Sequence, residues 1–229
     1  MKKVCFEYRK GGTGNETPFE IFLKYTDEKE KSSAVLGKIL SRLLAREDIT
    51  CLDIGSGNGE YLRLALSKVR DLKKVSITLL EPSVDLARRL HSTAKLFPRG
   101  ASVRVARSSF EDFTTDERFD IVLASHVPLA KDDLARLPAV YMRMLGLLKP
   151  NGSLIVVLRG KDDVHRFRTK FKSRLIGRKY RSLTIDDAER VLRRVTKTAS
   201  LRLSKFIAKV TLRLPYPGNI RDVILVAEF

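Results

Sequence analysis

Residues 51–61, CLDIGSGNGEY, place three glycines at alternate positions directly behind a short apolar run. The run ITCLDI (49–54) is typical of a buried strand, and YLRLALSKV (61–69) has the apolar spacing of a helix. The segment therefore predicts a strand, a tight turn and a helix in succession. Units of this kind build a parallel sheet that binds ligands at the carboxyl ends of its strands.

The same alternation continues along most of the chain. Further strands are predicted at 75–81, 102–106, 119–125 and 153–159, and further helices at 34–45, 82–94, 132–148 and 184–195. Two last strands, 200–214 and 221–229, flank the turn sequence PYPGN and are expected to pair antiparallel. We therefore predict an α/β fold with a doubly wound, mostly parallel seven-stranded sheet and an antiparallel last strand.

Composition narrows the class of protein. A chain of 229 residues can fill one α/β domain. Its start, MKKVCFEYRK, lacks an apolar signal core, and no stretch approaches membrane-span length, which predicts a cytoplasmic protein without membrane contact. Cys5 and Cys51 fit a reducing compartment, and three widely spaced histidines predict no metal site. The absence of Gln and Trp is a composition found in heat-stable proteins.

The glycine turn does not fit a dinucleotide. That fingerprint, G-x-G-x-x-G, requires a third glycine where this chain has Glu60, and an acid there would face a pyrophosphate. The observed pattern is D-x-G-x-G-x-G, starting at Asp53. It resembles the first motif of the class I S-adenosylmethionine (SAM) dependent methyltransferases. A cationic cofactor accounts for acids around the loop, whereas a phosphate does not.

Further segments carry this resemblance over about residues 48–160 and, more loosely, over the last two strands. LLEPS matches the family's second-strand turn, and LKPNGSLIVV matches its turn into the fifth strand. The resemblance implies a SAM-binding methyltransferase domain at 48–229, with an insert at 160–182. Residues 1–47 are then expected to be an N-terminal helical or cofactor-covering segment, in which Phe19 and Tyr25 either cover the cofactor or pack between helices.

The resemblance also implies roles for single residues. Asp53 would hold the methionine ammonium, and Glu81 would accept the ribose hydroxyls. Ser109, in SSFEDF, stands where many members carry an aspartate that reads adenine. Adenine would then be read by the Ser109 hydroxyl or by backbone near Phe110, whose ring packs either on the adenine or in the core. The expected cofactor-binding residues are Asp53, Gly55, Ser56, Gly57, Gly59, Glu81, Pro82, Ser109, Phe110 and Ser125.

The loop SHVP, Ser125–Pro128, is expected to face the methyl acceptor. Enzymes that methylate exocyclic base amines often carry [DNS]-P-P-[YFW] here, and only Ser125 fits that pattern. His126 has an unperturbed pKa of about 6.5, suitable for a base near neutral pH, but the residue here often only lines the cofactor pocket. The candidate catalytic residues are Ser125, His126 and Pro128.

Positive charge is concentrated near this expected site. The chain has 45 Lys/Arg against 27 Asp/Glu, and 159–213 holds 18 of the former and 5 of the latter, a net of +13. Aromatic residues at 167, 171 and 180 interleave with the cations, as in proteins that grip single-stranded or flipped-out nucleic acid. The alternative is a solvated basic face with these aromatics in the core. The expected RNA-binding residues, within 159–181, are Arg166, Arg168, Lys170, Lys172, Arg174, Arg178, Lys179 and Arg181.

Three functions follow from these patterns. The leading prediction is a methyltransferase that acts on ribosomal or transfer RNA at a base nitrogen, such as an exocyclic amine, and converts SAM to S-adenosylhomocysteine without a metal. The second is a small-molecule N- or O-methyltransferase resembling the histamine type. The third is a protein that binds SAM or RNA without catalysis. The sequence predicts no oligomeric state.

Overall fold

The computed structural model describes residues 26–46, 48–127, 134–159, 185–199, 201–211 and 219–228. Its helices are α2 (Glu28–Leu43), α3 (Glu60–Leu66), α4 (Val84–Ala94), α5 (Leu137–Gly146) and α7 (Ile185–Thr198). Its strands are β1 (Ile49–Ile54), β2 (Val75–Leu80), β3 (Ala101–Ala106), β4 (Phe119–Ser125), β5 (Leu148–Arg159), β6 (Arg202–Thr211) and β7 (Asn219–Glu228).

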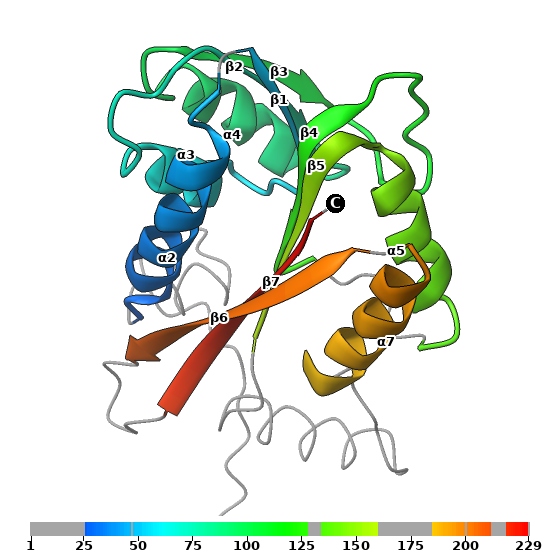
Figure 1. The fold of residues 1–229 in the computed structure, drawn as a ribbon. Coiled ribbons are helices and arrows are strands. Elements are labelled where there is room, and N and C mark those ends of the chain that lie inside the picture. Colours follow the sequence, from blue (N-terminus) through cyan, green and yellow to red (C-terminus); the bar gives the residue numbers. More distant parts are fainter. Residues whose placement is uncertain are drawn as a thin grey trace, which may run out of the picture.

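The strands form one seven-stranded sheet in the order β3-β2-β1-β4-β5-β7-β6 (Figure 1). The pairs from β3 to β5 are parallel, and β7 runs antiparallel to both of its neighbours, β5 and β6. This arrangement confirms the predicted doubly wound sheet with an antiparallel last strand.

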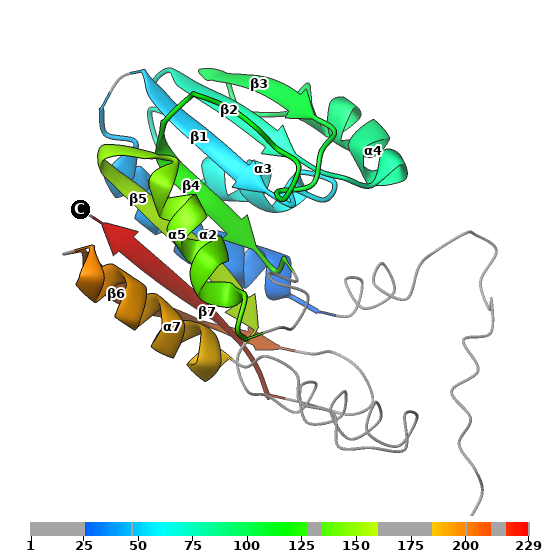
Figure 2. The same cartoon turned by 90° about the vertical axis from the view of Figure 1, so that its right-hand side faces the viewer.

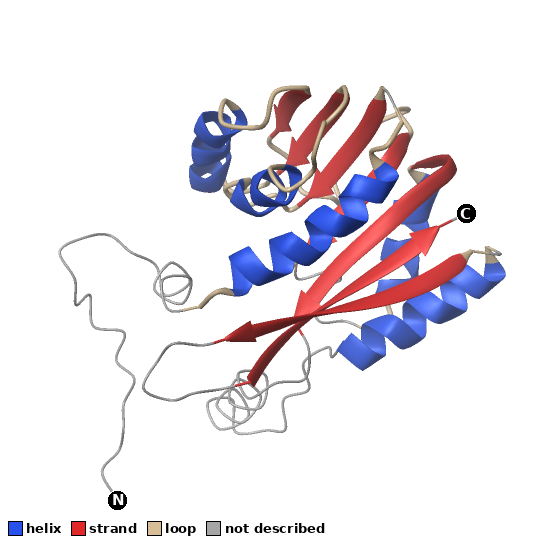
Figure 3. Ribbon diagram, turned by 60° about the vertical axis from the view of Figure 1, so that its left-hand side comes forward, coloured by secondary structure: helices blue, strands red, loops and turns tan. Residues whose placement is uncertain are grey.

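Helices cover the sheet on both faces (Figures 2 and 3). Alternate residues of each strand point to opposite faces, so β1 contributes Cys51 to a core shared with α2, α3 and α4, and Leu52 to a core shared with α5 and α7. Burial on both faces explains why β4, near the centre of the sheet, is almost continuously apolar, whereas the edge strand β3 is partly exposed. Burial also raises the pKa of the Cys51 thiol, which supports its interpretation as a packing residue.

Several element bounds differ from the prediction. Helix α2 begins at Glu28 rather than residue 34, because its first turns bury polar side chains that carry no apolar pattern, among them Ser32 and Ser33. Strand β5 begins at Leu148 rather than residue 153, and a register shift opposite β4 accommodates the KPNG turn. Helix α5 begins at Leu137, with a proline in its first turn, where the missing N–H is tolerated.

Helices α2 and α3 approach closely at Gly37. A Cβ there would lie 2.8 Å from Lys68 Cβ and 2.9 Å from the Ala65 carbonyl oxygen. We expect Gly37→Ala to destabilise the fold by about 1–3 kcal/mol, despite alanine's better helix propensity. The matched control is Gly146→Ala in α5, where an added Cβ meets no described residue within 4 Å and stability should rise by up to about 1 kcal/mol. Thermal unfolding of the two variants measures both effects; equal shifts would contradict the close approach.

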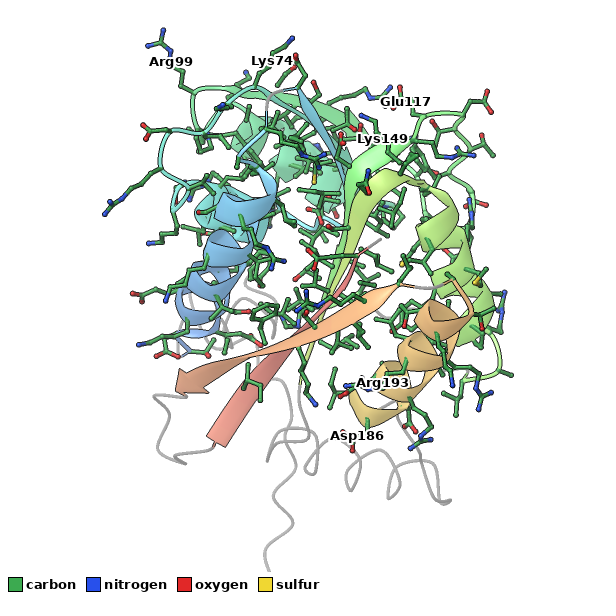
Figure 4. The ribbon with its side chains drawn as sticks, viewed as in Figure 1. Lys74, Arg99, Glu117, Lys149, Asp186 and Arg193 are labelled. Carbon is green, nitrogen blue, oxygen red and sulfur yellow. The ribbon has the colours of Figure 1, made fainter. Side chains whose placement is uncertain are left out.

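The topology gathers several loops at one edge of the sheet. Strands β1 to β5 are parallel, so their carboxyl ends lie together, and β6 ends at the same edge because it runs antiparallel to β7. Charged residues of the opposite edge, including Lys74, Glu117 and Lys149, lie at the top of Figure 4. The carboxyl edge therefore holds the glycine turn after β1 and the residues that follow β2 and β4.

Candidate functional site

The glycine turn after β1 has a backbone that most residues cannot adopt. Gly55, Gly57 and Gly59 have φ of +67°, +58° and +75°, in the left-handed region. Ser56 fixes the turn between them: its N–H donates to the Leu80 carbonyl oxygen (2.9 Å) and its hydroxyl to the Asp53 carbonyl oxygen (2.8 Å). The turn is thereby tied to the ends of β1 and β2.

The three glycines differ in what surrounds them. A Cβ on Gly55 would lie 2.7 Å from Val127 Cγ2, and one on Gly59 would lie 2.5 Å from Leu90 Cδ1. Among the described residues, a Cβ on Gly57 would meet no atom within 4 Å. Gly55 and Gly59 are therefore required by packing, whereas Gly57 leaves bare backbone facing open space, as close approach of a ligand requires.

Glu81 joins the glycine turn to the next helix. Its side chain is buried (6% exposed), because it follows β2 directly at the carboxyl edge of the sheet. One carboxylate oxygen accepts the Gly57 N–H (2.9 Å) and the other accepts the Ser83 N–H (2.9 Å). Ser83 in turn caps α4 by accepting the Leu86 N–H, and Pro82 separates it from Glu81.

Asp53 is a second buried acid at this edge, 4% exposed. Burial, together with the negative charge of Glu81, raises the pKa of Asp53 to about 7. It does not cap α3, whose N-cap position is Gly59. Two carboxylates beside bare backbone favour a ligand with a positive charge, because a cation offsets the cost of burying them.

Ser109 and Phe110, beyond β3, have contacts within the protein. The Ser109 hydroxyl donates to Asp112 Oδ2 (2.6 Å) and accepts the Asp112 N–H (3.1 Å), which closes a local turn. Phe110 is 8% exposed and belongs to the core, with the Arg143 guanidinium 4.5 Å from its ring centroid. Of the two positions predicted for the Phe110 ring, the structure shows the one in the core. Contact of Ser109 or Phe110 with adenine stays a prediction.

The loop after β4 lies directly against the glycine turn. His126 has a φ of +54°, and its N–H donates to the Val157 carbonyl oxygen of β5 (2.9 Å). The next residue, Val127, fills the space beside Gly55. The Ser125 hydroxyl oxygen is buried, with no hydrogen-bond partner among the described residues. Pro128 lies outside the described residues.

Tyr61 and its neighbours on α2 complete this side of the site, although the sequence did not single them out. The Tyr61 ring meets the His126 ring edge-on, with centroids 6.0 Å apart and planes at 79°. Its hydroxyl shares a hydrogen bond with the Ser32 hydroxyl (2.9 Å). Beside it, Lys29 pairs with Glu60; burial would raise the pKa of Glu60, but the Lys29 ammonium brings it below its usual value.

The predicted RNA-binding residues, Arg166 to Arg181, lie outside the described residues. The residues on either side of that segment are described: Arg159 ends β5 and Ile185 begins α7. Within the described ranges, no group of three His, Cys, Asp or Glu is arranged to hold a metal. In those ranges, too, no helix has both the length and the apolar character needed to cross a membrane.

A protein-family model described as "Methyltransferase domain" matches residues 28–196, which is most of the chain. The chain is a class I SAM-dependent methyltransferase. Among curated proteins, no sequence matches it.

Solved structures share the fold of this methyltransferase at low sequence identity. An N-methyltransferase, NodS from Bradyrhizobium japonicum in complex with S-adenosylhomocysteine, has a TM-score of 0.57 at 15% identity, covering 93% of this chain and 89% of its own. The cyclopropane synthase MmaA2 from Mycobacterium tuberculosis has a TM-score of 0.57 at 16% identity, covering 86% of this chain and 85% of its own. A protein described as a possible exported protein, from Bordetella parapertussis, has a TM-score of 0.64 at 15% identity, covering 95% of this chain and 74% of its own. At these identities the likeness concerns the fold and leaves the methyl acceptor open.

The residues at the carboxyl edge fit SAM as the methyltransferase's cofactor. Gly57 offers bare backbone, and Asp53 and Glu81 offer buried carboxylates for a ligand with an ammonium and hydroxyl groups. When bound, SAM supplies a methyl group on a sulfonium, activated for displacement. In the methyltransferase, Asp53 would hold the ammonium and Glu81 the ribose hydroxyls, while the loop at Ser125 and His126 would face the acceptor.

Gly57→Ala should affect cofactor binding more than folding. The new methyl group meets no atom of the part of the chain that the structure describes, so the folding cost comes from the left-handed backbone and is about 1–2 kcal/mol. It would, however, occupy the space through which SAM approaches, and we expect the Kd for SAM to rise at least tenfold, about 1.4 kcal/mol. Gly59→Ala, which drives a methyl into Leu90, is the contrasting variant and should lose stability first. Calorimetric titration with SAM and thermal unfolding separate the two; a normal Kd for Gly57→Ala would contradict this placement.

Proposed function

We propose that this methyltransferase transfers the methyl group of SAM to a base nitrogen of ribosomal or transfer RNA. The supporting observation is where the basic insert 160–182 is attached. The nearest described residues on either side are Arg159, at the end of β5, and Ile185, at the start of α7. They belong to the crossover at the carboxyl edge, where Glu81 and Gly57 lie. The insert carries nine Lys/Arg and two Asp, a net of +7. A positive segment attached beside the methyl donor suits a phosphate backbone.

Helix α7, which follows the insert in the sequence, adds further positive charge. Its exposed face carries Arg190, Arg193, Arg194 and Lys197. Arg190 and Arg193 have ion-pair partners within the helix, Asp187 and Glu189, which reduces but does not cancel the surplus. Arg193, labelled in Figure 4, is among the exposed residues of this helix. The positive charge of α7 therefore adds to that of the insert, which precedes it in the sequence.

Nitrogen is the proposed acceptor because methyl transfer requires mainly alignment. The acceptor lone pair must face the sulfonium methyl in line, and such alignment can contribute several kcal/mol to catalysis. A hydroxyl acceptor also needs a base, whereas an amine needs a hydrogen-bond acceptor for its proton. At the end of β4, the exposed His126 side chain offers such an acceptor, while the Ser125 hydroxyl, which fits the base-amine pattern, is buried.

The test is transfer of labelled methyl groups from SAM to total RNA at low and high salt. The RNA must come from cells that lack the enzyme, since native sites would otherwise be filled. Label that appears in RNA and falls with salt supports the proposal, because counterion release makes phosphate binding salt-dependent. Replacing the insert's eight candidate cations by glutamine should abolish RNA label and leave the Kd for SAM unchanged. Glutamine at two cations on the opposite edge, Lys74 and Arg99, is the control for cations far from the site (Figure 4).

A small amine is the second candidate acceptor. The N-methyltransferase NodS shares the fold of this chain, which makes an amine nitrogen outside RNA a reasonable acceptor. Label in a panel of small amines, with none in RNA, would establish this candidate and reduce the insert to a solvated face.

Binding without catalysis is the third candidate. It predicts SAM binding by calorimetry with no label in RNA or amines. A cytoplasmic location is part of the leading proposal, because ribosomal and transfer RNA are there, and cell fractionation tests it.

A further inference from the structure

Tyr61 lies where three elements of the site meet. It is the second residue of α3, directly behind the glycine turn. Its hydroxyl bonds to Ser32 of α2, which is fully buried, and its ring meets His126 of the loop after β4. One side chain therefore touches both the helix that packs beside the cofactor turn and the loop expected to face the acceptor.

The backbone of His126 is fixed, but its side chain is exposed. The bond from its N–H to Val157 extends the β4–β5 ladder by one residue, and Val127 beyond it packs beside Gly55. An exposed side chain keeps its rotamer freedom unless a neighbour restrains it. The edge-on ring of Tyr61, at 6.0 Å, supplies such a restraint, since aromatic pairs prefer this arrangement.

Ser32 fixes Tyr61 in turn. A tyrosine ring has two side-chain torsions, and a hydrogen bond at its far end holds both. The bond is sheltered, because Ser32 is fully buried, and the neighbouring pair of Lys29 and Glu60 joins the same two helices. The orientation of the Tyr61 ring is therefore set by the packing of α2 on α3.

We propose that Tyr61 is a positioning residue that orients the imidazole of His126 toward the methyl acceptor. The inference rests on the proposed function, because it takes the loop after β4 as the acceptor side of the site. Tyr61 acts through His126 and does not itself touch the acceptor. Its hydroxyl bond to Ser32 makes this orientation depend on α2.

A kinetic cycle tests whether Tyr61 acts through His126. Tyr61→Leu should lower kcat about tenfold, because misplacement of an aligning group is costly, and should change the KM for SAM less than about twofold. His126→Asn is the partner variant, since asparagine tolerates the positive φ at this position. In the His126→Asn background, Tyr61→Leu should have no further effect on kcat. A full additive loss in the double variant would overturn the proposal and leave Tyr61 a folding role.

A second measurement needs no acceptor. The chain has three histidines, so the ring signals of His126 in a ¹H–¹³C NMR spectrum are assigned by their disappearance in His126→Asn. Tyr61→Leu should shift these signals and leave those of His91 in place. Tyr61→Phe and Ser32→Ala keep both rings and should cause smaller shifts that match each other and do not add in the double variant.

The spectrum separates failure of this inference from failure of the proposed function. Unchanged His126 signals in Tyr61→Leu would overturn the orienting role, whatever acceptor the enzyme uses. Shifted signals with no methylation of RNA or amines would leave the orienting role in place and reject the proposed function. Should Tyr61→Leu fail to fold, Tyr61→Phe and Ser32→Ala carry the test, and His126 signals identical to wild type in both would overturn the proposal.

Discussion

Glu81→Ala should weaken SAM binding about a hundredfold or more. The wild-type carboxylate accepts the Gly57 and Ser83 N–H groups and would accept the ribose hydroxyls with its remaining lone pairs. Hydrogen bonds to a charged group are worth about 1.5–3 kcal/mol each, so two lost ribose bonds account for about 3 kcal/mol or more. The variant also leaves Gly57 without its anchor, which loosens the turn that must hold the cofactor.

Calorimetric titration with SAM measures this loss, and two further variants sharpen it. Glu81→Gln keeps one acceptor oxygen but turns an NH₂ group toward an N–H donor, so its affinity should fall at least tenfold. Glu117→Gln changes an exposed acid at the opposite edge, and its Kd should equal that of wild type. Wild-type affinity in Glu81→Ala would show that the cofactor binds elsewhere.

The parts of the site that the sequence predicted come from local patterns. Asp53, Gly57 and Glu81 each stand at the end of an apolar strand, and parallel strands bring their carboxyl ends to one edge. Their positions could therefore be predicted before the packing was known. The start of α4 at Val84, close to the predicted 82, is equally local, because its N-cap Ser83 accepts a hydrogen bond from a residue one turn ahead.

The parts that the sequence missed depend on contacts between distant elements. Tyr61 follows the glycine motif directly, but its partner Ser32 is 29 residues away on α2. No local periodicity signals a buried serine in the first turns of a helix, and for this reason the start of α2 was also misplaced. Arg143, which covers Phe110, comes from α5 and gives no sign of this role along the chain. Such contacts follow from tertiary packing, which a single sequence does not specify.

Cofactor affinity should fall as pH drops below about 7. Asp53 has its pKa raised to about 7 by burial and by Glu81, so at pH 6 most molecules without cofactor carry a neutral Asp53. The ammonium of SAM has an ordinary pKa near 8 and stays charged over this range. Binding to an ionised Asp53 must then release about one proton at pH 6, and affinity should fall up to tenfold for each pH unit below about 6.

Titration calorimetry in two buffers of different ionisation enthalpy counts the released protons. Asp53→Asn, which cannot ionise, should bind weakly and with no pH dependence between pH 5 and 7. A wild-type enzyme that releases no proton at pH 6 would show that Asp53 is already ionised before SAM binds. The Glu117→Gln variant should release the same number of protons as wild type.

The ionisation of Asp53 also predicts how the free energy of unfolding depends on pH when no cofactor is bound. A carboxyl whose pKa is higher in the folded than in the unfolded state binds its proton more tightly when folded, so stability is highest at low pH and is lost as pH rises from about 4 to about 7. The shift of about three pKa units corresponds to a loss of the order of 4 kcal/mol in the free energy of unfolding.

Asp53→Asn mimics the protonated form. The difference in stability between this variant and wild type should therefore be near zero at pH 4 and should be greatest above pH 7, in favour of the variant. Denaturant unfolding at both pH values measures this difference, and a constant difference would mean that Asp53 titrates normally. SAM stabilises the ionised carboxylate and should therefore restore the stability that is lost above pH 7. The free-energy cost of ionising Asp53 is thereby linked to cofactor binding.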